Sequence, residues 1–210
     1  MKNHLLIILF YGISIITFGQ NSETQLKIAP DNFELDNDDL RNIIDFQDIE
    51  FKKATITGND LKGKTFHLKA KEIWDGKVVS ENTIENSANR PEFVKYLRKI
   101  NDTIFKIKVI SKLTSENKIK MDFIFPRTST SREFKLHKTK DLYRLRNLAA
   151  ESNLEIRLDK PFPLFAYILP YHRGNGFSSY CDVGSSGKDV ENWGEKFGIK
   201  HYIIFELEFK

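Results

Sequence analysis

Short segments that alternate apolar and polar side chains recur along most of this chain, and they restrict it to folds built from antiparallel strands. Residues 64–73 and 77–84 alternate in this way on either side of Asp75-Gly76. An Asp-Gly pair favours the two-residue turn of a β-hairpin, whose two strands are antiparallel. Comparable segments follow at 49–56, 103–110, 119–125, 133–137, 154–158, 164–169, 177–183 and 202–209.

Helical signals are few and short. Asn37 and the two acids after it precede apolar residues at helical spacing, which predicts a capped helix within residues 37–46. A short helix is also predicted after Pro91, and another over residues 141–150. No glycine-rich nucleotide motif and no regular alternation of strands with long helices is present, which argues against a parallel sheet. We therefore expect a mainly β (β-rich α+β) fold, an antiparallel β-sandwich or jelly-roll-like single domain.

The first residues have the layout of a secretory signal peptide. Lys2 precedes an apolar run over residues 5–18, and Thr17 and Gly19 are small residues at the −3 and −1 positions of a cleavage site. The run is shorter than the roughly 20 residues of a membrane-spanning helix. We expect a signal peptide at 1–19, a polar and acidic segment with a short helix at 20–46, and a β-rich domain at 47–210. This predicts a periplasmic or secreted protein with no stable membrane span after cleavage.

Charge is distributed unevenly along the chain, whose formal net charge is +4. Residues 31–50 hold eight acids and one base, whereas residues 51–150 hold 23 bases and 11 acids. Because lysines alternate with apolar residues in segments such as 105–109, we interpret the basic excess as the solvated face of strands. We expect no nucleic-acid partner. An anionic glycan, or the acidic segment of the chain itself, is a better match for the charge.

A single cysteine, Cys181, rules out an internal disulfide and a zinc site of the CxxC type. We expect no cofactor and no metal ion. A run of Ser and Thr between Arg127 and Arg132 is interpreted as a polar loop, with an oxyanion pocket between the two arginines as the alternative.

Residue types that carry out binding gather between positions 167 and 193, around a turn with glycines at 174 and 176. A scaffold commonly presents binding groups at such turns. Exposed aromatic rings stack on sugar faces, and the neighbouring polar groups bond to hydroxyls. The candidate ligand-binding residues are Tyr167, Tyr171, His172, Arg173, Asn175, Tyr180, Asp182 and Trp193.

Two chemical alternatives use the same region, and a plain hairpin turn explains the composition equally well. Cys181 is a candidate nucleophile, with His172 or His201 as base and Asp182 or Asn175 as the orienting group. His172, His201 and Asp182 are a candidate metal site without a recognised spacing. Neither pattern carries a family signature, and the serine-hydrolase motif GxSxG is absent.

Three functions remain open at this point. The first is a non-catalytic, exported protein that binds a glycan or peptide of the cell envelope through the hairpin region 171–182. The second is an exported hydrolase or transferase that uses the pair Cys181 and His172. The third is a structural or interaction subunit of an envelope complex.

Overall fold

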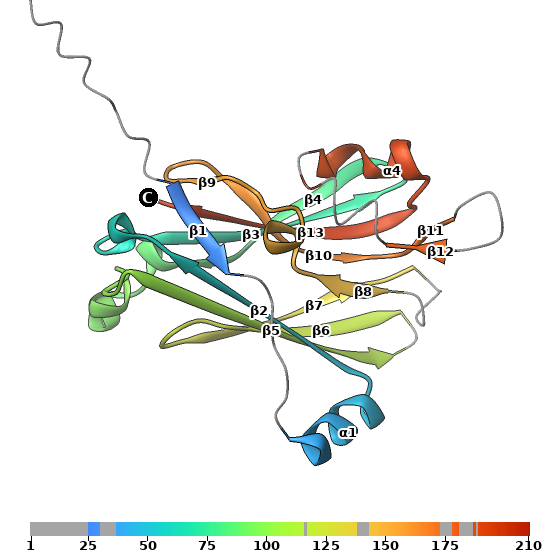
Figure 1. The fold of residues 1–210 in the computed structure, drawn as a ribbon, viewed down its shortest axis with the longest axis horizontal. Helices are drawn as coiled ribbons and strands as arrows, with labels where there is room; N and C mark the ends of the chain where they lie inside the picture. Colours follow the sequence, from blue (N-terminus) through green and yellow to red (C-terminus); the bar gives the residue numbers. More distant parts are fainter. Residues whose placement is uncertain are drawn as a thin grey trace, which may run out of the picture.

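Two antiparallel β-sheets make up most of the structure (Figure 1). The computed structural model describes residues 25–29, 37–115, 117–137, 143–172, 178–180, 187 and 189–210. The first sheet has the strand order β7-β6-β5-β2-β1-β9, and the second has the order β4-β3-β13-β10-β8. The prediction of a mainly β, antiparallel, sandwich-like fold is confirmed.

The strands of the two large sheets are short to medium in length. The first sheet contains β1 (Gln25–Ala29), β2 (Ile49–Thr57), β5 (Ile104–Ser115), β6 (Lys118–Ile124), β7 (Ser129–Lys135) and β9 (Ile156–Arg157). The second contains β3 (Phe66–Trp74), β4 (Lys77–Asn86), β8 (Arg144–Arg146), β10 (Phe162–Ile168) and β13 (His201–Phe209). A separate two-stranded hairpin joins β11 (Tyr171–His172) and β12 (Ser178–Ser179).

The described helices are short. They are α1 (Asp38–Phe46), α2 (Leu148–Glu151) and α4 (Trp193–Phe197), with single 3-10 turns at Asn59–Leu61, Ser87–Asn89 and Val190–Asn192 and a longer one at Glu92–Leu97. Among the residues that the structure describes, no helix has the length and apolar character needed to cross a membrane.

The core lies between the facing surfaces of the two sheets. On β5, Phe105 and Ile107 are fully buried while Lys106 between them is exposed, which confirms the predicted solvated lysine face. Aromatic rings from both sheets meet in the middle. The Phe105 and Phe209 ring centroids are 5.3 Å apart, and those of Phe123 and Phe205 are 5.1 Å apart.

The β3–β4 hairpin forms at the predicted Asp75-Gly76 turn. Both residues have positive φ, 48° and 74°, as the two-residue turn requires. Helix α4 packs directly on this turn, since a Cβ atom added to Gly194 would lie 2.4 Å from Cα of Gly76. A side chain at position 194 therefore has no room, and the turn and α4 are fixed against each other.

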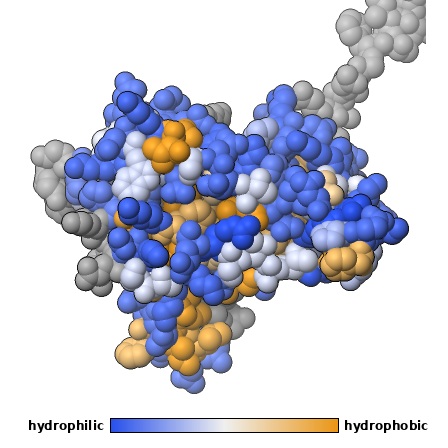
Figure 2. Space-filling model, turned by 180° about the vertical axis from the view of Figure 1, so that it is seen from behind, coloured by the Kyte–Doolittle hydropathy of each residue, from blue (hydrophilic) through white to orange (hydrophobic). Residues whose placement is uncertain are grey.

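Helix α1 confirms the predicted cap. Oδ1 of Asn37 accepts a hydrogen bond of 3.0 Å from the Leu40 amide. The helix buries none of its residues, and its apolar side chains Ile43 and Phe46 are 59% and 84% exposed. Figure 1 shows α1 projecting from the sheets, and Figure 2 shows apolar atoms gathered on this projection.

Three sequence-based predictions of local structure are wrong. Residues 141–150 do not form one helix, because Leu145 lies in β8, where it pairs with Tyr167, and α2 begins only at Leu148. Residues 127–132 are not a loop throughout, since β7 begins at Ser129. The strand expected at 154–158 is reduced to the two residues of β9. In each case strand pairing decides the outcome over local spacing: β8 pairs with β10, β7 with β6, and β9 with β1.

Candidate functional site

The aromatic rings of the predicted binding region are core residues. Tyr167, Tyr171 and Trp193 are 3%, 6% and 0% exposed, so their faces do not form the open stacking surface that the sequence suggested. The Tyr167 ring stacks on Tyr143, with centroids 5.0 Å apart, and the Trp193 ring packs 5.6 Å from Tyr202. Large apolar rings gain more from this burial than from water contact.

The rest of the predicted region is only partly described. His172 is exposed and pairs with Ser178 across the β11–β12 hairpin, where Ser178 Oγ lies 2.9 Å from His172 Nδ1. Tyr180 is half-buried, with the Arg146 guanidinium 6.0 Å from its ring centre. Arg173, Asn175, Cys181 and Asp182 lie outside the described residues. The ligand-binding role of the hairpin and the Cys181/His172 pair therefore stay predictions.

His201, the alternative base and metal ligand, is a fully buried residue of β13. Its Nδ1 atom lies 2.6 Å from the Tyr143 hydroxyl, and burial lowers its pKa to about 4. Among the described residues, no cluster of three or more His, Cys, Asp or Glu side chains is arranged to hold a metal ion.

A cleft of about 640 Å³ lies elsewhere, beside the first residues of β5. It exists because the two neighbouring strands end at different points. β5 begins at Ile104, but β6 ends at Ile124, which pairs with Lys108. Residues 104–107 thus have no β6 neighbour. The segments 97–102 and 125–128 enclose the space that remains.

Both enclosing segments are held by backbone hydrogen bonds. The Phe125 amide donates to the Thr128 carbonyl at 2.8 Å, which closes the turn after β6. The Ile100 amide donates to the Lys64 carbonyl at 2.8 Å, and the Gly63 amide donates to the Ile100 carbonyl at 2.7 Å. Backbone hydrogen bonds therefore fix the position of both walls of the cleft.

The floor of the cleft is aromatic. Phe66 lies between Phe105 and Phe125, with ring centroids 4.9 Å and 5.0 Å away. Ile104, at the start of β5, also lines the cleft and is 40% exposed. The three rings are only 4%, 0% and 4% exposed, so Ile104 supplies most of the apolar surface that is open to a ligand.

The lining is strongly basic. Five basic side chains and one acidic side chain, Asp102, line the cleft; the basic residues are Arg90, Lys99, Lys106, Lys108 and Arg127. A concave surface of one charge concentrates ions of the opposite charge. The cleft therefore attracts anions.

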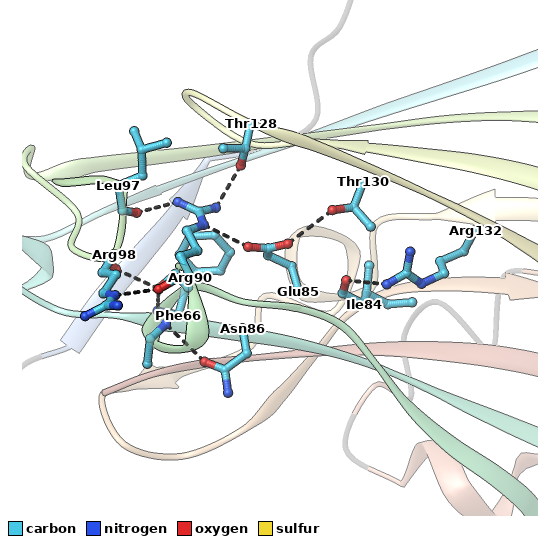
Figure 3. Close-up of polar contacts among 12 residues, drawn as sticks. Phe66, Ile84, Glu85, Asn86, Arg90, Leu97, Arg98, Thr128, Thr130 and Arg132 are labelled. Atoms are coloured by element: carbon cyan, nitrogen blue, oxygen red, sulfur yellow. Dashed lines mark hydrogen bonds and ion pairs between the residues drawn. The ribbon is translucent and has the colours of Figure 1, made fainter. Parts of the chain in front are cut away.

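Arg90 has a structural role in this set (Figure 3). Its guanidinium donates to Glu85 Oε1 at 2.9 Å, to Thr128 Oγ1 at 2.7 Å and to the Leu97 carbonyl. Thr130 of β7 donates to the other oxygen of Glu85 at 3.1 Å. These bonds join β4, an edge strand of the second sheet, to β7, an edge strand of the first, and they neutralise Arg90 with Glu85.

The other four basic residues are available for a ligand. With the Asn101 amide oriented to suit its neighbours, its oxygen accepts from Arg127 Nη2 at 2.8 Å and its nitrogen donates to the Lys99 carbonyl at 3.2 Å. This holds the Arg127 guanidinium without neutralising it. Within the described part of the chain, Lys99, Lys106 and Lys108 form no ion pair.

Sequence reasoning found only one member of this cleft, Arg127. The alternative of an oxyanion pocket between Arg127 and Arg132 gains no support, because Arg132 does not line the cleft and donates instead to the Ile84 and Ser131 carbonyls. The basic excess of residues 51–150 was the signal for the rest. It indicated an exposed charged face, but it did not show which lysines converge.

Comparison with known proteins gives no relative: no family model, no curated protein and no solved structure matches this chain.

Proposed function

We propose that this chain is a non-catalytic binding protein that works outside the cytoplasm and holds an organic anion with an apolar face in the basic cleft. The observation that carries this proposal is the convergence of four basic side chains, which form no ion pair among the described residues, around the exposed apolar side chain of Ile104. The location rests on the signal-peptide pattern of residues 1–19.

Binding suits this cleft better than catalysis. The described lining includes no histidine, cysteine or serine, and its one carboxylate, Asp102, accepts a hydrogen bond from the Thr103 amide at 2.7 Å. Histidine, cysteine and serine, the commonest general bases and nucleophiles, are therefore missing from the part of the cleft that the structure describes. Envelope glycans and peptides that carry carboxylate groups beside apolar faces have the required chemistry.

A displacement titration tests the proposal. Anilinonaphthalene sulfonate is an anionic aromatic probe whose fluorescence rises in apolar surroundings, and octanoate is a non-aromatic competitor with a carboxylate. We expect the probe to bind saturably and octanoate to displace it, whereas octylamine, with the same chain and the opposite charge, does not. Rising salt concentration weakens the binding because exposed lysines are screened.

Variants locate the binding. The double substitution Lys106→Gln/Lys108→Gln removes two charges from the cleft and is expected to weaken octanoate binding about tenfold. Lys118→Gln/Lys135→Gln is the matched control, since Lys118 and Lys135 are exposed lysines of β6 and β7 that do not line the cleft. Equal affinity of the double variant and the control, or equal displacement by octylamine, contradicts the proposal.

A further inference from the structure

A second cavity, of about 310 Å³, lies near the other end of β5 and shares no lining residue with the basic cleft. One wall comes from Glu50 of β2 and Ser111 of β5, which pair directly in the first sheet. The opposite wall is the stacked pair Tyr143 and Tyr167, whose ring planes are 8° from parallel. Since Tyr167 belongs to β10, the cavity lies between the two sheets.

The Ser111 hydroxyl lines this cavity without a hydrogen-bond partner. Ser111 is 1% exposed, and no described residue makes a hydrogen bond of good geometry with its Oγ atom. The hydroxyl faces the Glu50 carboxyl and favours its ionised form, but the two groups do not reach hydrogen-bond geometry. Buried hydroxyl groups almost always form a hydrogen bond, because moving a hydroxyl out of water without replacing its hydrogen bonds costs free energy. This hydroxyl can therefore bond to a ligand placed in the cavity.

Glu50 has acceptor capacity for the same ligand. One carboxylate oxygen accepts from the Leu145 amide at 3.1 Å, and the other lies 3.9 Å from Arg144 Nη1. Each carboxylate oxygen can accept two hydrogen bonds, so these contacts leave positions open. Burial raises the pKa of Glu50, although Arg144 and the Leu145 amide favour its ionised form.

Charge around the cavity selects against ions of either sign. Three carboxylates line it, from Asp45, Asp48 and Glu50, together with the basic side chains of Lys112 and Arg144. An anionic ligand is repelled by the three carboxylates, and a cationic ligand is repelled by Lys112 and Arg144. A neutral ligand that both donates and accepts hydrogen bonds satisfies Glu50 and Ser111 without adding a charge.

We propose that this cavity binds a neutral, hydroxyl-bearing ring of the size of one sugar residue. One ligand hydroxyl donates to the Glu50 carboxylate, and a second ligand oxygen accepts from the Ser111 hydroxyl. The volume is at the lower end of the range for ligand sites, which fits a single ring and not an extended chain. This site is independent of the anion cleft, so either one can fail without the other.

Backbone-amide NMR on the whole chain tests the proposal, with glucose, galactose and mannose as probes. Saturable shifts are expected at the amides of Ser111 and Leu145. Ser111 carries the hydroxyl that binds the ligand, and the Leu145 amide donates to the Glu50 carboxylate. Glucuronate and glucosamine, which carry a negative and a positive charge on the same ring, are expected to bind more weakly than glucose.

Two conservative variants link the shifts to the cavity. Ser111→Ala removes one hydrogen bond, and Glu50→Gln replaces a charged acceptor with a neutral one, so each is expected to weaken sugar binding about three- to tenfold. Ser115→Ala, at an exposed position of the same strand, is the control. The proposal is overturned if none of the three sugars shifts these amides saturably, if Ser111→Ala binds like the control, or if a charged analogue binds more tightly.

Discussion

The Tyr143 hydroxyl lies 2.6 Å from Nδ1 of His201 and links two buried side chains that are 58 positions apart. The same hydroxyl accepts a hydrogen bond of 3.0 Å from the His137 amide. The Trp74 ring covers the imidazole, with centroids 4.0 Å apart. This arrangement fits a neutral imidazole whose Nδ1 accepts a hydrogen bond from the Tyr143 hydroxyl. The imidazole then carries its proton at Nε2, for which the structure shows no hydrogen-bond partner.

Stability is expected to fall in mild acid because of His201. Burial lowers the pKa of its imidazole to about 4, below the ordinary value of 6.5. The unfolded chain therefore takes up a proton near pH 6.5, while the folded chain resists it until about pH 4. The free energy of unfolding should be highest above that window and decrease by up to about 1.4 kcal/mol per pH unit through it.

Urea denaturation of the wild type and His201→Gln at several pH values checks this expectation. Glutamine does not titrate, so the variant should lose this part of the pH dependence even if it is less stable at every pH. Parallel curves for the two proteins show that another group is responsible.

Replacing Arg90 should open the contact between β4 and β7. The Arg90 and Glu85 side chains are only 10% and 17% exposed, so Arg90→Ala leaves a carboxylate without its partner. We expect a loss of about 2–4 kcal/mol in the free energy of unfolding. Arg90→Lys should recover only part of it, since lysine lacks the planar fork that reaches Glu85, Thr128 and Leu97 together. Lys95→Ala breaks an exposed ion pair with Glu92 and is the control, expected to change stability by under about 1 kcal/mol.

Trp193→Ala separates two views of this residue. An exposed binding residue would lose ligand affinity with the fold intact. The buried position predicts instead a loss of about 3–5 kcal/mol in the free energy of unfolding. Tyr96→Ala, at a side chain that is 63% exposed, should change stability by about 0.5 kcal/mol or less. Similar unfolding midpoints for the two variants would contradict the buried position of Trp193.

Gly194→Ala should destabilise the protein although alanine favours helices. The added methyl group meets the backbone of Gly76, with Cα at 2.4 Å and N at 2.6 Å, so α4 or the β3–β4 turn has to move. We expect a loss of about 1–3 kcal/mol from this overpacking, measured by thermal or urea unfolding. An unchanged or higher stability would mean that α4 does not rest on the turn.

Local signals predicted the fold class well. The Asp75-Gly76 turn, the Asn37 cap and the alternation through Phe105 and Lys106 each depend on residues close in sequence, and each is confirmed. Leu145 shows where this reasoning fails. Its spacing from Leu148 fits a helix, but pairing with Tyr167, 22 positions away, places it in a strand.

Binding residues were harder to predict because exposure is a property of the folded chain. An aromatic ring such as Trp193 suits a core as well as a sugar site. Its burial in the folded chain, where it packs against Tyr202, shows that it belongs to the core. The basic cleft was missed for a related reason. Lys99, Lys108 and Arg127 converge because β6 ends opposite Lys108, and that register is not visible in the sequence.

The most direct measurement is a map of backbone-amide NMR shifts during an octanoate titration. The proposed function predicts saturable shifts concentrated at Asn101, Phe105, Lys108 and Arg127, around the basic cleft. Shifts concentrated instead at His172 and Ser178 would place the site on the β11–β12 hairpin. That result, or the absence of any saturable shift, contradicts anion binding in the cleft.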